Sequence, residues 1–184
     1  YFSTGTKQAL KSIRRNAGMI RKVYVPKYMY PLAASLSSYI TFVLSLVVLV
    51  VVAAVQGIRP TVYLVGAVVP LATIFLMVTA IGFLLATLDV FFRDLEYIWN
   101  VATMLIMYMS AIFYEPDALL KSDYGFLIRY NPLYSVIANF QNAVVYGKPL
   151  EGFYVWYPIV VSLVVLVAGL VFFYRKQDTF VLYL

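Results

Sequence analysis

The sequence predicts an all-α polytopic membrane protein, a helical bundle that crosses the bilayer several times. Of its 184 residues, 64% are hydrophobic and only 12% are charged, which is more apolar surface than a soluble domain can bury. The apolar residues form continuous runs of about twenty residues, the length that a helix needs to cross a hydrocarbon core. Because these runs lack the polar alternation of barrel strands, the predicted spans are helices.

Four segments are long and apolar enough to be transmembrane spans. The second is the longest and can tilt in the membrane, and Pro70 is expected to kink it. All four belong to one predicted membrane domain, residues 1–184. Because the chain starts with Tyr1 and not Met, we interpret it as part of a longer protein, with its first two residues as the last turn of an earlier span. The four spans are residues 32–55, 62–88, 97–113 and 154–174.

Residues 1–31 are rich in cations and contain no acid. They hold seven of the 14 Lys and Arg residues, and the first acid of the chain is Asp89. Four apolar residues are spaced like one face of a helix, so we expect an amphipathic helix at or just under the membrane surface. Pro26 and Pro31 should then break the helix and extend the backbone before each of them, giving a stiff elbow before the first span. The four apolar residues are Ala9, Ile13, Ala17 and Ile20.

The placement of Lys and Arg predicts which side of the membrane each loop faces. With residues 1–31 in the cytoplasm, the inner side carries ten cations and the outer side four, as the positive-inside rule requires. Four spans return the chain to its starting side, so both ends, including residues 175–184, are predicted to be cytoplasmic. This rule alone would explain the opening cations as a topology signal. Beyond the opening segment, the inner cations are Arg93, Arg175 and Lys176, and the outer ones are Arg59, Lys121, Arg129 and Lys148.

Residues 115–153 connect the last two predicted spans and are too long for a plain loop. Asn131 and Pro132 have the pattern of a helix N-cap followed by proline at the first helical position. Apolar residues continue at helical spacing until Gly147 ends the helix. We therefore expect two short re-entrant or interfacial helices at the outer face, the first broken near Gly125. An amphipathic cap on the bundle is the simpler structural interpretation of this segment.

Several kinds of chemistry have no candidate residues in the sequence. The chain has no Cys and no His, which removes disulfides, thiolate metal sites and the commonest metal ligand. It has no phosphate-binding Gly-rich loop ending in Lys-Ser/Thr. No acid lies centrally in a predicted span, where an ion relay would need one. We therefore predict no enzyme activity, no cofactor, no metal and no nucleic-acid partner.

Aromatic residues are abundant, with 17 Tyr, 13 Phe and 2 Trp. Many lie at the ends of spans, as an interfacial belt requires, including Trp99, Tyr154, Trp156 and Tyr157. A further group follows the outer end of the third span. Flat apolar faces with polar tips suit sugar rings, so this group is a candidate pathway for a long polar chain. Its members are Tyr108, Phe113, Tyr114, Tyr124, Phe126, Tyr130 and Tyr134.

Four stretches together resemble the type-2 ABC exporter permeases, and most closely the branch that exports polysaccharide, O-antigen and teichoic acid (polyol phosphate) chains. The resemblance covers essentially the whole chain, with these stretches in the right order and spacing. Two positions depart from the usual pattern: Glu115 precedes Pro116 where many relatives have Tyr, and Gln141 stands where many carry Arg. The stretches are IRRNAGMIRKVYVPKYMYPLA, FFRDLEYIWNVATMLIMYMSAIFYEPDAL, IRYNPLYSVIANFQNAVVYGK and FYRKQDTFVLYL.

The resemblance implies a six-span protein of the bacterial plasma (inner) membrane, of which the four spans here would be the last four. It implies a second copy of the same chain, two ABC ATPase subunits that hydrolyse ATP, membrane lipids and a lipid-linked glycan as partners. The residues that it assigns to ATPase coupling are Arg14, Arg15, Asn16, Arg21, Lys22, Tyr24 and Pro26. Those that it assigns to the intracellular turn are Arg93 and Asp94. For the glycan pathway or outer gate, the residues are Tyr108, Phe113, Tyr114, Asn131, Pro132 and Tyr134.

Three alternatives stay open at this stage. A type-2 exporter of drugs or lipids would share the architecture but lack a response to glycan. An ion-coupled secondary transporter would work without any ATPase and needs a buried acid within a span. A membrane-embedded transferase needs a clustered acid or metal site.

Overall fold

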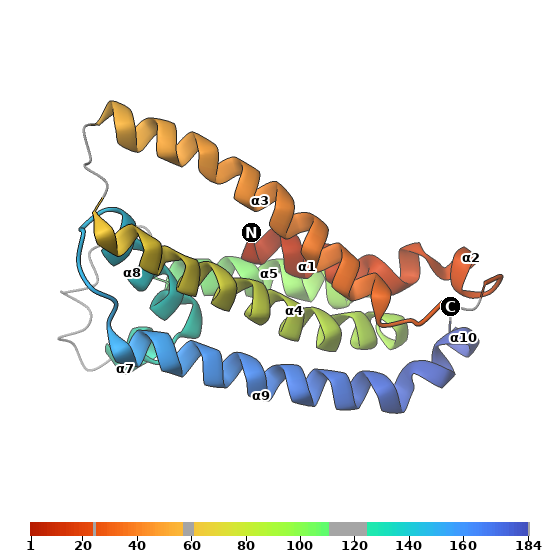
Figure 1. Cartoon of the computed structure of the whole chain (residues 1–184). Helices are drawn as coiled ribbons and strands as arrows, with labels where there is room; N and C mark the ends of the chain where they lie inside the picture. Colours follow the sequence, from red (N-terminus) through yellow and green to blue (C-terminus); the bar gives the residue numbers. More distant parts are fainter. Residues whose placement is uncertain (24, 57–60, 111–124, 184) are drawn as a thin grey trace.

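The structure, a computed structural model, describes residues 1–23, 25–56, 61–110 and 125–183. All its regular elements are helices, and the long ones run side by side along one axis (Figure 1). Three helical segments within the described residues are long and apolar enough to cross a membrane. These segments are Met29–Val55, Val62–Phe91 and Gly152–Thr179. The all-helical membrane fold predicted from the sequence is confirmed, with three of the four expected spans.

Helix α4 (Val68–Phe91) is the centre of the bundle. Half of the residues in the most apolar stretch of this span are buried, against 6% for α3 (Met29–Val55) and 17% for α9 (Gly152–Lys176). It packs along α9 on one side and along α1 (Phe2–Arg15) on the other. The α9 contact is close because Gly169 presents no side chain, and a Cβ there would stand 3.1 Å from the Ala80 carbonyl oxygen.

Both prolines at the starts of spans have a different effect from the one predicted. Pro31 is the third residue of α3, so the backbone before it is helical and not extended. Pro70 is the third residue of α4, so it does not kink the helix interior; the short 3-10 helix η1 (Val62–Ala67) leads into α4 just before it. In the first turn of a helix, proline loses no hydrogen bond, because the N–H groups there have no partner within the helix.

The opening helix α1, which was predicted to lie at or just under the membrane surface, packs against other helices of the bundle. Its apolar face is buried against α3 and α4, and the side chains of Ala9, Leu10 and Ile13 are at most 1% exposed. Tyr1 lies beside the middle of α3, where its ring stacks on Phe42 at 5.2 Å between centroids. The chain therefore starts partway along the bundle (Figure 1), and not at one end of it.

The third predicted span corresponds to α5 (Leu95–Met109), which has 15 residues in the described part of the chain. At 1.5 Å per residue, a helix of this length covers about 22 Å, short of a ~30 Å hydrocarbon core. The predicted span continued to residue 113, and residues 111–124 lie outside the described ranges. The fourth transmembrane span thus stays a prediction.

Two short helices lie at one end of the bundle, near the start of α9 (Figure 1). They are α7 (Gly125–Arg129) and α8 (Pro132–Val144), and α8 packs against α9, η1 and α4. The N-cap predicted at Asn131 is confirmed, since its side chain accepts a hydrogen bond from the Leu133 N–H at 3.0 Å. Gly147 follows the end of α8 with φ of 57°, the left-handed conformation that glycine adopts readily.

The C-terminal residues fold back at the opposite end. After α9, the 3-10 helix η2 (Gln177–Thr179) leads into α10 (Phe180–Tyr183). Phe180 is fully buried in a cluster with Phe173 of α9 and Ile13 of α1. Lys27 donates a hydrogen bond to the Gln177 carbonyl at 2.6 Å, which ties the segment before α3 to this end of the chain.

Candidate functional site

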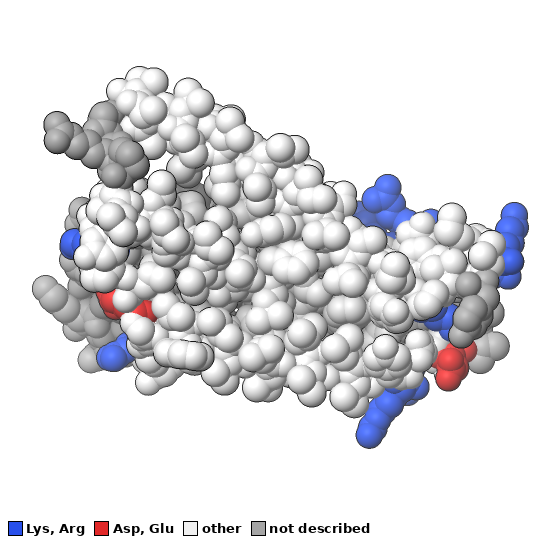
Figure 2. Space-filling view, in the orientation of Figure 1, with Lys and Arg blue, Asp and Glu red and all other residues white. Residues whose placement is uncertain are grey.

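Cations gather at the end of the bundle that carries α2 (Ala17–Ile20) and α10 (Figure 2). Four of the predicted coupling residues are exposed there: Arg15, Arg21, Lys22 and Pro26. Tyr24, a fifth, lies outside the described residues. We call this surface, together with the exposed Arg175 and Lys176, the basic end.

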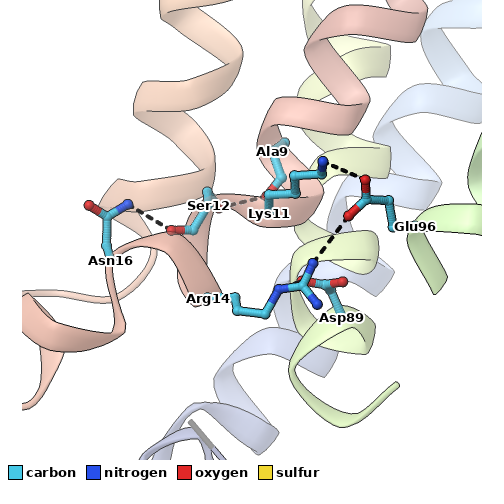
Figure 3. A network of polar contacts seen from close by, with 7 residues as sticks. All are labelled: Ala9, Lys11, Ser12, Arg14, Asn16, Asp89 and Glu96. Atoms are coloured by element: carbon cyan, nitrogen blue, oxygen red, sulfur yellow. Dashed lines mark hydrogen bonds and ion pairs between the residues drawn. The ribbon is translucent and has the colours of Figure 1, made fainter. Parts of the chain in front are cut away.

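A network of charged side chains lies directly behind the basic end and joins three helices (Figure 3). Lys11 of α1 pairs with Glu96 of α5 at 2.5 Å. Arg14 of α1 donates a hydrogen bond to the other Glu96 oxygen at 3.3 Å and pairs with Asp89 of α4 at 3.4 Å. We call these four residues the charge network.

The helices place these groups by simple geometry. Lys11 and Arg14 are three residues apart on α1, so their side chains project from neighbouring positions on one side of the helix. Glu96 is in the first turn of α5, where the helix dipole favours a negative charge. The hydrogen bond from Lys11 lowers the pKa of the Glu96 carboxyl, with further lowering by the Arg14 charge. Glu96 is therefore charged at neutral pH.

Asp89 is the exceptional member of the charge network. Its side chain is 1% exposed, and it stands near the C-terminal end of α4, where the helix dipole disfavours an anion. Neither carboxylate oxygen accepts a hydrogen bond within the described structure, so the contact with Arg14 is an ion pair only. Since an unpaired buried carboxylate is costly, Arg14 is the group that makes this position tolerable.

Arg14 and Asn16 were predicted to face a partner, but the structure shows them bonded within the chain. Arg14 reaches back to Asp89 and Glu96, and Asn16 donates a hydrogen bond to the Ser12 carbonyl at 2.7 Å. Asn16 also separates α1 from α2, which the sequence predicted as one continuous helix. The two residues fix the direction in which the chain leaves α1 toward the basic end.

Lys11, Asp89 and Glu96 were missed by the sequence reasoning. The acids were noted only as residues at the ends of spans, and no local pattern pairs them with α1. The distribution of charge was a usable signal. Residues 1–31 carry seven cations and no acid, and the acids nearest to them on the predicted cytoplasmic side are those beside the turn at Arg93 and Asp94. Trp99 was placed in the aromatic belt, yet its indole N–H donates to the Thr6 hydroxyl at 2.9 Å and also ties α5 to α1.

Arg93 and Asp94, the predicted intracellular turn, are exposed between α4 and α5. They line a pocket of about 630 Å³ together with Phe92 and, from α10, Tyr183. The turn therefore faces the same end of the bundle as the cations, next to the C-terminal helix.

The predicted outer residues separate into different environments. Tyr108 is 54% exposed on α5, whereas Tyr134 is buried on α8 and makes an edge contact with the Tyr154 ring. Asn131 donates to the Met109 carbonyl at 3.2 Å, so it joins the end of α5 to the start of α8. Pro132 occupies the first position of α8. Phe113 and Tyr114 lie outside the described residues.

Replacing Asn131 with alanine should lower the free energy of unfolding by about 1 kcal/mol, the usual cost of a lost N-cap. The contacts of its amide with the Met109 carbonyl and the Ser110 hydroxyl would be lost as well. Thermal denaturation in detergent measures the change. Asn131→Asp is the control, because it keeps the cap acceptor and removes the amide donor. If Asn131→Asp is as unstable as Asn131→Ala, the cap is not what stabilises this junction.

An aromatic cluster lies beside these residues at the start of α9. The rings of Tyr130, Phe153 and Tyr157 contact one another, with Phe153 and Tyr157 stacked at 5.4 Å. Arg129 stands over the Phe153 ring at 5.7 Å, within the range of a cation–π contact. The cluster joins α7 to α9 and includes Tyr157, which the sequence assigned to the interfacial belt.

No protein-family model matches the chain. It is 28% identical over 182 residues to the O-antigen export system permease protein RfbA of Klebsiella pneumoniae, covering 98% of this chain and 69% of that protein. A second Klebsiella pneumoniae protein of that name is 27% identical over 183 residues, with the same coverage. The protein of that name from Myxococcus xanthus is 25% identical over 142 residues, 77% of this chain and 55% of the relative. These relatives confirm the resemblance drawn from the sequence: along almost its whole length, the chain is similar to type-2 ABC exporter permeases of the O-antigen export branch.

Proposed function

We propose that the chain is the transmembrane permease subunit of an ATP-driven exporter that moves a lipid-linked polysaccharide across the bacterial inner membrane. A partner ATPase, in two copies, hydrolyses the ATP, and a second copy of the permease completes the pathway. The observation that carries the proposal is the link between the exposed basic end and α5 through the charge network. The similarity to O-antigen export permeases supports the choice of substrate.

The basic end is the proposed contact with the ATPase. Arg15, Arg21 and Lys22 point away from the bundle and form no ion pair within the described residues. Such cations suit an acidic protein surface or the lipid phosphates beside it. In this arrangement the basic end is cytoplasmic, and so is the C-terminal segment beside it.

The charge network is the proposed route by which a push on α2 reaches the transport pathway. Helix α4 is the most buried of the long helices, so it serves as the fixed element. Helix α5 contacts the rest of the bundle far less, and its side chains are mostly exposed. Lys11 and Arg14 hold the first turn of α5 to α1, so a displacement of α1 should move α5.

The proposed pathway runs beside α5, between the two copies of the permease, with α5 continuing through residue 113 as a fourth span. The exposed residues of α5 include Tyr97, Val101, Met104, Leu105 and Tyr108. The helices α7 and α8 are the proposed outer re-entrant elements, held to α5 by Asn131. Tyr108, with Phe113 and Tyr114, would offer sugar rings weak and repeated contacts.

Reversing Arg15, Arg21 and Lys22 to glutamate should lower glycan-stimulated ATP hydrolysis by roughly tenfold or more, because like charges would then face the acidic partner surface. Membrane insertion should be unaffected, since Lys27, Arg175 and Lys176 still mark the inner side. The measurement is ATPase activity of the complex purified from membranes.

The matched control for this variant is Lys148→Glu, a reversal at the other end of the bundle. It should leave ATP hydrolysis unchanged. Full stimulation in the triple variant would show that the exposed cations do not couple the permease to an ATPase.

A further inference from the structure

Three cations follow one side of α1 at helical spacing, and two of them pair with an acid in the part of the chain that the structure describes. Lys11 and Arg14 bind the two oxygens of Glu96. Lys7 is one helical turn before Lys11 on α1. It lines a small gap together with Glu96 and Asn100. It forms no ion pair or hydrogen bond with any residue in the described ranges.

The register of the two helices explains this mismatch. Further along α5 than Glu96, the residues near α1 include Trp99, Asn100 and Thr103, and none of the three carries a charge. Both oxygens of Glu96 already pair with a cation, Lys11 on one and Arg14 on the other. Lys7 is therefore a positive charge partway along an apolar bundle that no acid among the described residues pairs with, and such a charge is costly in a membrane.

Lys7 also lines a pocket of about 430 Å³ enclosed by α1, α4, α5 and α8. The size falls in the range of small-ligand sites. Besides Lys7, its polar lining residues are Ser3, Asn100 and Thr103, and most of the remaining lining is apolar. Met104 is 58% exposed at the edge, so the pocket opens on the α5 side. The apolar wall is formed by Phe2, Ile74, Met104, Met107, Leu133 and Ile137.

We propose that this pocket binds the phosphate-bearing end of a single-chain lipid, with the phosphate on Lys7 and Asn100 and the first part of the chain along the apolar wall. A phosphate supplies the missing negative charge and several acceptor oxygens for one ammonium and one amide donor. A neutral lipid would leave the charge of Lys7 uncompensated. The flexible side chains of Met104 and Met107 suit the irregular shape of a hydrocarbon chain.

The proposal deepens the proposed function and rests on it in one respect: it identifies the ligand as the lipid anchor of the exported glycan. The pocket of about 430 Å³ has room for part of one hydrocarbon chain and suits one chain better than the two of a membrane phospholipid. A site here would place the anchor next to the helix that the charge network moves.

Binding of dodecyl phosphate to the purified protein in a neutral maltoside detergent tests the site, with dodecanol as the uncharged probe. We expect Lys7→Gln to weaken binding of dodecyl phosphate by about tenfold, the usual loss for one charge-assisted hydrogen bond. Lys7→Arg should retain binding within a few fold, and Lys148→Gln should not change it. Binding of dodecanol should be the same in wild type and Lys7→Gln.

A second variant addresses the apolar wall independently of Lys7. Met104→Trp should fill the groove and weaken both dodecyl phosphate and dodecanol. Unchanged affinity for dodecyl phosphate in both Lys7→Gln and Met104→Trp would overturn the proposal. If phosphatidylglycerol competes as strongly as dodecyl phosphate does, the pocket is a phospholipid site and the assignment to a lipid anchor is wrong.

The binding assay separates this proposal from the proposed function, because it needs no ATPase and no transport. Binding that depends on Lys7, together with the absence of any co-purifying ATPase from membranes, would support the pocket and contradict the exporter. Glycan-stimulated ATP hydrolysis together with binding that ignores Lys7 would support the exporter and contradict the pocket.

Discussion

Replacing Arg14 with methionine should lower the free energy of unfolding by about 3 kcal/mol, because the change leaves Asp89 buried without a counter-charge. Asp89 is 1% exposed and accepts no hydrogen bond in the described structure, so the nearby guanidinium is its closest compensation. The same variant should weaken the link between α1 and α5, of which the Lys11–Glu96 pair and the Trp99–Thr6 hydrogen bond remain, and so reduce ATP hydrolysis. Reversible unfolding in mixed detergent measures the stability change.

Arg15→Met is the matched control, one residue away on the same helix. Arg15 is exposed and has no ion pair with a described residue, so this variant should change stability by less than about 0.5 kcal/mol. The double variant Arg14→Met with Asp89→Asn should recover part of the loss, because the buried charge is gone. No recovery would mean that Arg14 acts through packing and not through Asp89.

Gly82→Ala should destabilise the protein by about 2 kcal/mol, as overpacking at a tight helix contact does. A Cβ at residue 82 of α4 would stand 2.8 Å from the Ala9 Cβ of α1, closer than two carbon atoms can approach. One helix must move away from the other, and the charge network lies just beyond this contact. Thermal denaturation in detergent reports the loss.

The Gly82 prediction has a specific rescue. In the double variant Gly82→Ala with Ala9→Gly, the methyl group is moved from α1 to α4, so the clash disappears. Stability should then return to within about 1 kcal/mol of the wild type, whereas Ala9→Gly alone costs about 1 kcal/mol through helix propensity. A double variant as unstable as the sum of the two single variants would show that Ala9 and Gly82 do not pack as described.

Local rules were enough to predict part of this structure. The start of α8 follows from Asn131 and Pro132, whose side-chain cap and fixed φ act within a few residues. The long helices were found from apolar length, and α3 begins only three residues before the predicted residue 32. The effect of Pro31 was misjudged because its position within the first turn decides whether it breaks a helix.

The position of α1 depends on contacts that the sequence does not display. Its cations and apolar face suit a surface helix as well as a buried one. What places it in the bundle is the fit between Ala9 and Gly82, which are 73 positions apart in the chain. The charge network is equally non-local, since Glu96 meets Arg14 across 82 positions. A single sequence gives residue types and spacing, but it does not say which helices are neighbours.

The candidate site was therefore predicted in outline and not in detail. Arg15, Arg21 and Lys22 are exposed at one end, as a coupling surface requires. Arg14 was predicted to contact the ATPase. In the structure its guanidinium pairs with Asp89 and Glu96 inside the bundle. Lys7 had no assigned role until its position in a pocket beside α5 was known.

ATP hydrolysis by the protein purified gently with its natural partners, with and without a lipid-linked glycan, tests the central claim most directly. The exporter account predicts an ATPase that co-purifies and is stimulated by the glycan. An ATPase that ignores the glycan would keep the transporter class and contradict the substrate. A protein that purifies without any ATPase would contradict the account itself and leave the basic end as a topology signal.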